Sequence, residues 1–127
     1  MSITPLYAAL LALLFVFLSF RIIRLRRALQ VGLGDAGDKQ LGRAIRVHAN
    51  FAEYVPLALV LLFFVEAQPA PFWWVHLLGL LLLVGRLLHA YGLGQVNETL
   101  IFRMIGMIMT FSSVIFAAVY LLVTVLV

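Results

Sequence analysis

The chain has 127 residues, of which 65% are hydrophobic and 11% are charged, with a formal net charge of +4. About one quarter of a soluble domain is charged, so this composition predicts a membrane protein with a single domain, residues 1–127. Cysteine is absent, which excludes disulfides, thiolate metal sites and a cysteine nucleophile, and no metal site is predicted. There is no long basic tail, so nucleic-acid binding is not expected.

The apolar runs predict an all-α membrane protein, a bundle of four transmembrane helices that are each long enough to cross a bilayer. Thr4 and Pro5 suit the start of the first helix, and Asp38 suits the N-cap of the second. Pro56 predicts a bend within the second helix, and Asn97 suits the N-cap of the fourth. The expected helices cover about residues 5–29, 39–67, 72–91 and 98–126.

All nine Lys and Arg residues lie in or beside the first and third connections. The two termini and the second connection carry none. Positive residues next to membrane spans favour the cytoplasmic side. We therefore predict that both termini lie outside and that the polar residues face the cytoplasm.

One face of the second helix carries polar side chains directly before an apolar run. Arg43, Arg46, Asn50, Glu53 and Tyr54 fall within an arc of roughly 100° on a helix. A charged side chain at membrane depth costs about 2.5–3.5 kcal/mol, even on the most lenient insertion scales. This face must therefore turn toward protein, water or a charged ligand.

The charges of this face are expected to find partners on other helices. Arg46 and Glu53 are seven residues apart, whereas ion pairs within a helix favour separations of three or four. Arginines of the other three helices lie on the same side of the membrane, with His89 beside one of them: Arg26, Arg27, Arg86 and Arg103. An excess of arginines around one carboxylate suits an anion that also carries an ammonium group, such as a peptide or an amino acid. A purely structural network is the alternative.

Other polar residues have simpler interpretations. His48 points away from the arginine face and is expected to contact another helix or the lipid headgroups. Glu66 and His76 lie near the outer interface and are expected to reach water. Arg21, Arg24 and Lys39 are expected to determine the topology.

The segment RAIRVHANFAEYVP, residues 43–56, resembles the membrane-associated proteins in eicosanoid and glutathione metabolism, the MAPEG family. Arg26 and Arg27, the VGLGD turn at 31–35 and the VGRLLHAYGLG segment at 84–94 support the resemblance, which covers nearly the whole chain. It looks like a bacterial branch of this family. The resemblance implies a homotrimer of four-helix subunits in the bacterial inner membrane. It also implies that glutathione, as co-substrate, is held between neighbouring subunits near the cytoplasmic side.

The resemblance further implies roles for particular residues. Arg103 approximately matches the fourth-helix arginine that activates the thiol, so it is the expected catalytic residue. Arg27 matches a first-helix arginine that contacts ligand or substrate. Tyr91 lies near a position at which several eukaryotic members carry a tyrosine, where this chain has Leu93. The expected glutathione-binding residues are Arg27, Arg46, Asn50, Glu53, Tyr54, Arg86, His89 and Tyr91.

The chemistry of glutathione agrees with these residues. Arginines can clamp its two carboxylates, and Glu53 can accept hydrogen bonds from its ammonium group. A thiol has a pKa of about 8.5, and an adjacent guanidinium favours the nucleophilic thiolate. We therefore expect a glutathione-dependent transferase that acts on lipophilic electrophiles from the membrane lipid, entering between the first and fourth helices, with reduction of lipid hydroperoxides as a second activity.

The sequence is also compatible with two other functions. One is a small four-helix transporter in which Glu53 is the titrating group. The other is a non-catalytic membrane protein that binds lipid or glutathione without turnover.

Overall fold

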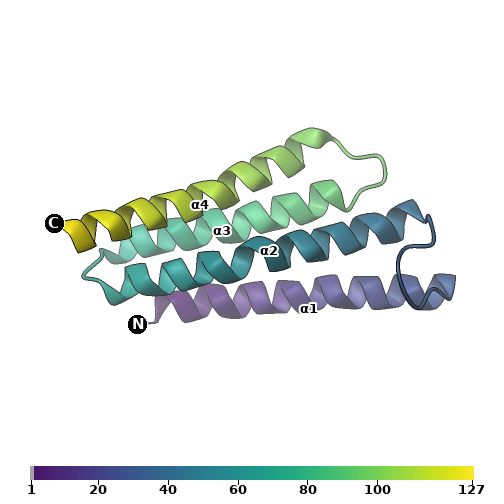
Figure 1. Ribbon diagram of the computed structural model, residues 1–127, viewed down its shortest axis with the longest axis horizontal. Coiled ribbons are helices and arrows are strands. Elements are labelled where there is room, and N and C mark those ends of the chain that lie inside the picture. The colour runs from purple at the N-terminus through teal and green to yellow at the C-terminus, as the bar shows by residue number, and fades with distance from the viewer. Residues whose placement is uncertain (1) are drawn as a thin grey trace.

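The computed structural model describes residues 2–127 and shows a bundle of four long helices. Both chain ends and the connection 68–71 lie at one end of the bundle, and the connections 30–38 and 94–99 lie at the other (Figure 1). The best apolar window of each helix has a mean hydropathy between 1.6 and 2.4, which suffices for a membrane span. The all-α, four-helix membrane fold is therefore confirmed. Its helices are α1 (Ile3–Leu29), α2 (Lys39–Ala67), α3 (Phe72–Leu93) and α4 (Leu100–Leu126).

The helix α1 begins at Ile3, one residue before the predicted cap at Thr4, because a carboxylate from α2 caps it. The Glu66 side chain accepts hydrogen bonds from the backbone N–H groups of Ile3 and Thr4, each at 2.8 Å. A negative charge is favourable at a helix N-terminus, where backbone N–H groups lack partners. Glu66 is half-buried and so still reaches water as predicted, but its side chain also ties the end of α2 to the start of α1.

The other helix ends follow the sequence only in part. Asp38 caps α2 as predicted, its carboxylate accepting from the N–H of Leu41 at 2.8 Å. The fourth helix starts at Leu100 after Thr99, so Asn97 is not its cap. The third helix extends two residues beyond the predicted end at residue 91, to Leu93. Gly92, within it, packs closely against α4: a Cβ atom there would lie 2.7 Å from the backbone N of Arg103.

Two glycines allow α3 and α4 to approach each other closely. A Cβ atom added at Gly106 would lie 2.5 Å from the carbonyl oxygen of Gly85 and from the backbone N of His89. Contact between small residues is a common way to pack helices within membranes. This approach sets the distance between the helices that carry Arg86 and Arg103.

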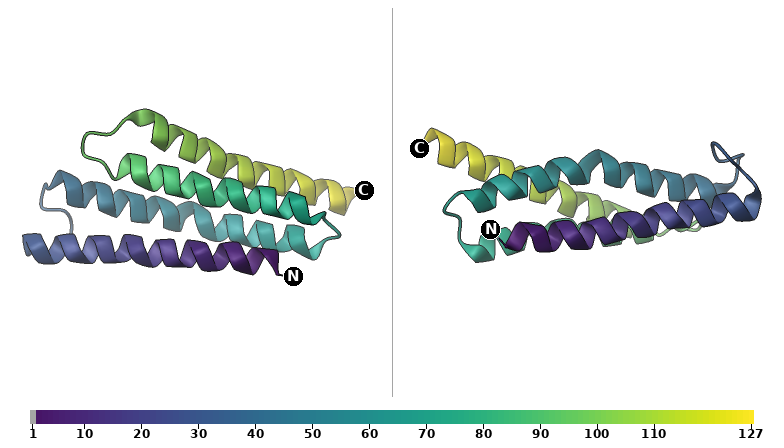
Figure 2. Two further views of the ribbon diagram at one scale, coloured as in Figure 1. Left: turned by 180° about the vertical axis from the view of Figure 1, so that it is seen from behind. Right: turned by 90° about the horizontal axis from the view of Figure 1, so that it is seen from below.

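The helices α1 and α4 lie on opposite sides of the bundle and make no contact with each other within residues 2–127 (Figure 2). The helix α1 packs mainly against α2 and also contacts α3, whereas α4 packs mainly against α3 and also contacts α2. The expected entry path between the first and fourth helices is therefore wrong for a single chain. Such a path would require α1 and α4 of different copies of the chain.

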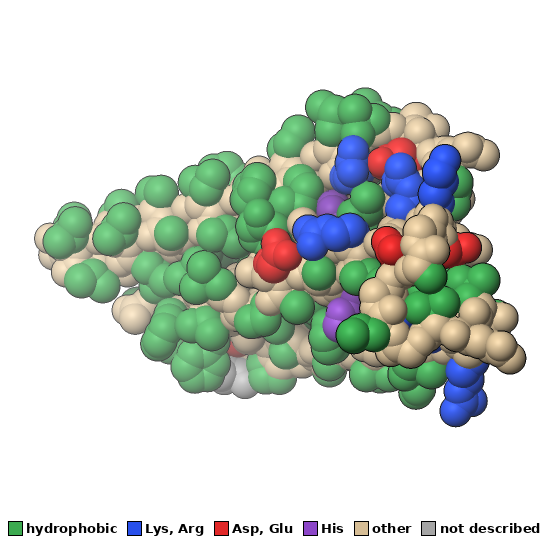
Figure 3. Space-filling model, turned by 45° about the vertical axis from the view of Figure 1, so that its right-hand side comes forward, with side chains coloured by type: hydrophobic (Ala, Val, Ile, Leu, Met, Phe, Trp, Pro, Cys, Tyr) green, Lys and Arg blue, Asp and Glu red, His purple; other side chains and the backbone are tan. Residues whose placement is uncertain are grey.

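The outer surface is apolar over most of its length and charged at one end. Large apolar side chains such as Leu13 and Phe17 are more than half exposed, at 69% and 61%, as expected for a lipid-facing surface. Lys and Arg side chains gather over the end that carries the connections 30–38 and 94–99 (Figure 3). This charge distribution agrees with the one-sided placement of Lys and Arg in the sequence.

Candidate anion-binding site

A groove of about 540 Å³ lies between α2, α3 and α4, toward the charged end of the bundle. Its polar side chains come from all three helices, and Leu93 of α3 and the Met and apolar residues of α4 form the remainder of its wall. This volume is typical of sites that bind small molecules. The lining residues are Arg46, Asn50, His89, Leu93, Leu100, Arg103, Met104, Met107, Ile108 and Phe111.

Arg86 lies behind this groove and is almost completely buried, with 1% of its surface exposed. Its Nη2 donates a hydrogen bond to Oδ1 of Asn50 at 2.6 Å and lies 3.3 Å from Nδ1 of His89. Both of these partners line the groove. Arg86 therefore contacts the groove through these two side chains and through Met107, whose Sδ lies 3.6 Å from Nη1 and which also lines the cavity.

The charge of Arg86 has no counterion within residues 2–127. Its remaining contacts are neutral: Nη1 lies 3.5 Å from the Thr110 hydroxyl, the Phe51 ring centroid is 5.8 Å from Cζ, and the Nε atom is buried without a partner. An unpaired buried charge is costly, by several kcal/mol for an isolated ion. The positive potential behind the groove thus favours a negatively charged ligand in front of it.

Arg46 and Glu53 form an ion pair on the surface of α2, with 3.6 Å between Nη2 and Oε1. The prediction that each would need a partner from another helix was wrong. The arginine side chain is long, and the Glu53 side chain leans toward the N-terminus of the helix, which brings the two together across two turns. Both side chains are more than half exposed, so the pair is weak and the Glu53 carboxylate remains accessible.

Arg103 is held by a carboxylate that the sequence analysis did not single out. Oε1 of Glu98 lies 3.3 Å from Nη2 of Arg103 and 2.9 Å from Nη1 of Arg43, and only 10% of the Glu98 side chain is exposed. Arg43 also donates to the carbonyl oxygen of Leu93 at 3.1 Å. Glu98 thus links the start of α4 to α2. The sequence could have indicated this role, because Glu98 lies five residues before Arg103 at the end of the bundle where the arginines of the second helix also lie.

The structure separates the remaining predicted binding residues from the groove. Tyr54 packs edge-on against Phe111, with ring centroids 5.4 Å apart, so it supports one wall of the groove. Tyr91 is 58% exposed and packs against Phe102. Arg27 lies on the outer face of α1 and lines a different cavity. A single chain therefore brings together Arg46, Asn50, His89 and Arg103, with Arg86 behind them, but not Arg27, Glu53 or Tyr91.

His48 and His76 have structural contacts. The Nε2 atom of His48 lies 3.0 Å from the Ser19 hydroxyl, and its ring stacks on Phe15. This confirms that His48 contacts another helix. His76 Nδ1 lies 2.9 Å from the Tyr7 hydroxyl, so this histidine joins α3 to α1.

Comparisons with known proteins agree with the fold. The family model described as the MAPEG family matches residues 4–123. The chain is 48% identical over 90 residues to "Inner membrane protein YecN" of Escherichia coli (strain K12), which covers 71% of this chain and 69% of that protein. The protein of the same name from Escherichia coli O6:H1 matches with the same identity and coverage. No solved structure matches the chain.

Proposed function

The chain belongs to the MAPEG family, and we propose that it is an inner-membrane transferase that joins the thiolate of glutathione to lipophilic electrophiles. The observation that carries this proposal is the buried, unpaired guanidinium of Arg86 behind a groove that Arg46 and Arg103 also line. Three positive groups around a cavity of this size suit a small anion with more than one negative group.

The charges around the groove support glutathione in particular. Arg46 and Arg103 line the groove and Arg86 lies behind it, while Arg43, Glu53 and Glu98 belong to the ion pairs of Arg46 and Arg103 outside it. These four guanidinium groups and two carboxylates leave an excess of two positive charges. Glutathione in its thiolate form has two carboxylates, one ammonium group and the thiolate, and therefore two net negative charges. The groove and the reactive form of this ligand are complementary in charge.

The arginine side chains also support a division of roles. A guanidinium stays protonated and cannot act as a base, so the thiol proton goes to water. Arg103 favours the resulting thiolate electrostatically, because it lines the groove and is more than one-third exposed toward it and the solvent. The thiolate sulfur then attacks the electrophilic carbon, a C–S bond forms, and the leaving group departs with the bonding electron pair.

The apolar wall of the groove suits the second substrate. Met104, Met107 and Ile108 of α4 line it, and the neighbouring outer surface of α4 carries exposed apolar side chains. An electrophile dissolved in the bilayer can therefore approach the groove along α4 without crossing water. We infer that the natural electrophile is lipid-soluble.

The position of Glu53 argues against the transporter alternative. A titrating carboxylate that carries protons across a membrane normally faces the interior of a bundle or a water-filled cavity. The Glu53 side chain is 52% exposed at the outer surface of α2, is paired with Arg46, and does not line the groove. The observations thus favour a ligand site over a transport path.

Calorimetric titration of glutathione into the detergent-solubilised protein tests binding, and conjugation of a chromogenic electrophile tests turnover. Asn50→Ala should weaken binding, because Asn50 lines the groove and holds Arg86. His48→Gln is the matched control, since His48 lies on the same helix but contacts α1. Absence of glutathione binding by the wild-type protein would refute the proposal. Binding without conjugation would support the non-catalytic alternative instead.

A further inference from the structure

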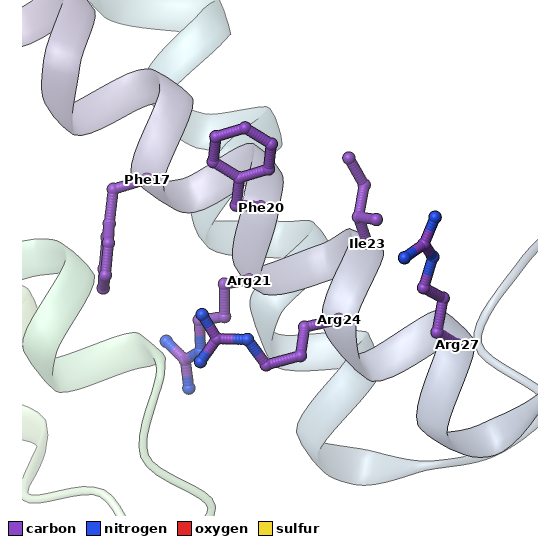
Figure 4. A pocket seen from close by; sticks show the side chains of 6 residues that line it. All are labelled: Phe17, Phe20, Arg21, Ile23, Arg24 and Arg27. Carbon is purple, nitrogen blue, oxygen red and sulfur yellow. The ribbon is translucent and has the colours of Figure 1, made fainter.

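A second cavity, of about 520 Å³, lies on the outer face of α1 near its C-terminal end. All of its lining side chains come from this one helix (Figure 4). They comprise three apolar side chains and three arginines: Phe17, Phe20, Arg21, Ile23, Arg24 and Arg27. The cavity is separate from the groove between α2, α3 and α4, with which it shares no residue.

The three arginines of this cavity have no counterion. No Asp or Glu of residues 2–127 forms an ion pair with Arg21, Arg24 or Arg27. Arg21 is held in place because its Nη2 donates to the carbonyl oxygen of Gly94 at 2.9 Å, which leaves its other donors free. Arg24 extends to the same side of the helix as Arg21, and Arg27 follows one turn later (Figure 4). Three uncompensated guanidinium groups within one cavity favour an anionic ligand.

The apolar residues of the cavity determine how such a ligand would be oriented along α1. Phe17 and Phe20 are 61% and 59% exposed. They precede Arg24 by two turns and one turn, so they lie about 5–10 Å farther into the apolar part of α1. A ligand that satisfies both parts of the cavity has an anionic group at the level of the arginines and an apolar chain beside the phenylalanines.

We propose that this cavity binds an anionic phospholipid of the adjacent leaflet, with the phosphate at Arg21 and Arg24 and an acyl chain along Phe17 and Phe20. Guanidinium groups recognise phosphate by paired, charge-assisted hydrogen bonds, and basic pockets at membrane surfaces bind lipid headgroups in this way. Free phosphate has no group to cover the aromatic side chains. The site therefore takes a lipid and leaves the groove between α2, α3 and α4 free for its own ligand.

The first experiment identifies the molecule that covers the cavity on α1. A photo-crosslinking amino acid replaces Phe17 in the full chain, which is reconstituted into vesicles and analysed for adducts by mass spectrometry. The vesicles contain phosphatidylcholine with one quarter phosphatidylglycerol. We expect adducts that carry the mass of a phospholipid, with phosphatidylglycerol enriched over its share of the mixture. Adducts that carry the mass of a second chain would show that another copy of the protein covers this face, and they would overturn the proposal.

Native mass spectrometry of the purified protein measures the lipid preference. Arg24→Gln should lower the retention of phosphatidylglycerol by about fivefold, the effect expected for one arginine at a membrane surface. Arg26→Gln is the matched control, because Arg26 has the same charge on the same helix but donates to the Gly34 carbonyl and lies outside this cavity. If Arg24→Gln does not fold, Arg27→Gln tests the third arginine of the same cavity, with a smaller loss expected because the phosphate is placed at Arg21 and Arg24.

Three outcomes of this measurement would overturn the proposal. Equal losses in Arg24→Gln and Arg26→Gln would indicate a general attraction to the basic end of the molecule. Equal retention of phosphatidylcholine and phosphatidylglycerol by the wild-type protein would show that the arginines do not select an anion. Displacement of the lipid by inorganic phosphate would indicate a site for the free ion.

Discussion

Arg103 and Glu98 are joined by an ion pair of 3.3 Å, and the carboxylate oxygen that forms it is also 2.9 Å from Arg43. The other oxygen of Glu98 is buried without a partner. Glu98 thus fixes the guanidinium of Arg103 at the edge of the groove and at the same time reduces its positive charge. In the proposed reaction, Glu98 therefore has two opposing effects. It orients Arg103 toward the groove, and it weakens the positive potential that Arg103 exerts on the thiolate.

Replacing Glu98 by glutamine should therefore separate these two effects. Loss of the shared charge should destabilise the protein by about 1–3 kcal/mol, because two arginines lose a largely buried partner. The freed charge of Arg103 should lower the pKa of the glutathione thiol in the complex. Thermal unfolding in detergent measures the first effect, and the ultraviolet absorbance of the bound thiolate against pH measures the second. Glu53→Gln is the control for stability, because its pair is exposed.

Replacing Arg103 by alanine should leave most glutathione binding intact but abolish most turnover at neutral pH. Without the guanidinium, the pKa of the bound thiol rises, so the thiolate fraction at a given pH falls about tenfold for each unit of the rise. The activity of the variant should recover as the pH increases, and its pH–rate profile should shift upward. Arg26→Gln serves as a control outside the groove. An unchanged profile would remove Arg103 from the activating role.

Replacing Glu53 by glutamine should weaken the binding of glutathione more than the binding of its deaminated analogue. The Glu53 carboxylate lies outside the groove but is weakly paired with Arg46, which lines it, so the ammonium group of a ligand held at Arg46 can reach this exposed carboxylate. Calorimetric titration with both ligands gives the comparison. Equal losses for the two would show that Glu53 does not bind the ammonium group.

Replacing Gly106 by alanine should destabilise the bundle by about 1–3 kcal/mol, the usual cost of an overpacked contact. The added Cβ atom would lie 2.5 Å from backbone atoms of α3, so the two helices must move apart. Because His89 and Arg103 lie on these two helices, glutathione affinity should fall as well. Gly32→Ala is the matched control, since a Cβ atom at Gly32 meets nothing within 4 Å. Equal melting temperatures for the two variants would contradict the close contact between α3 and α4.

The homotrimer remains a prediction, and the structure of one chain makes it testable. The groove is open on the surface of a single chain, and α1 contributes no residue to it. If a neighbouring subunit completes the site, the native mass in mild detergent should correspond to three chains of 14.2 kDa. A monomer that binds glutathione with full affinity would show that one chain is sufficient.

The sequence alone was enough to predict the number of helices, their approximate bounds and the gathering of positive charge at one end. These properties depend on hydropathy and charge along the chain, which are local and need no knowledge of packing. The polar face of α2 was also recognisable, because helical periodicity places Arg46 and Asn50 on one side. Family resemblance added the chemistry that this face could perform.

Only the tertiary structure decided which charges meet. It paired Arg46 with Glu53, assigned Glu98 to Arg43 and Arg103, and buried Arg86 behind Asn50 and His89. Such partners depend on the rotation of each helix and on how closely two helices approach, as at Gly85 and Gly106. These quantities arise from the packing of side chains far apart in the chain, and a pattern of residue types along one helix does not contain them.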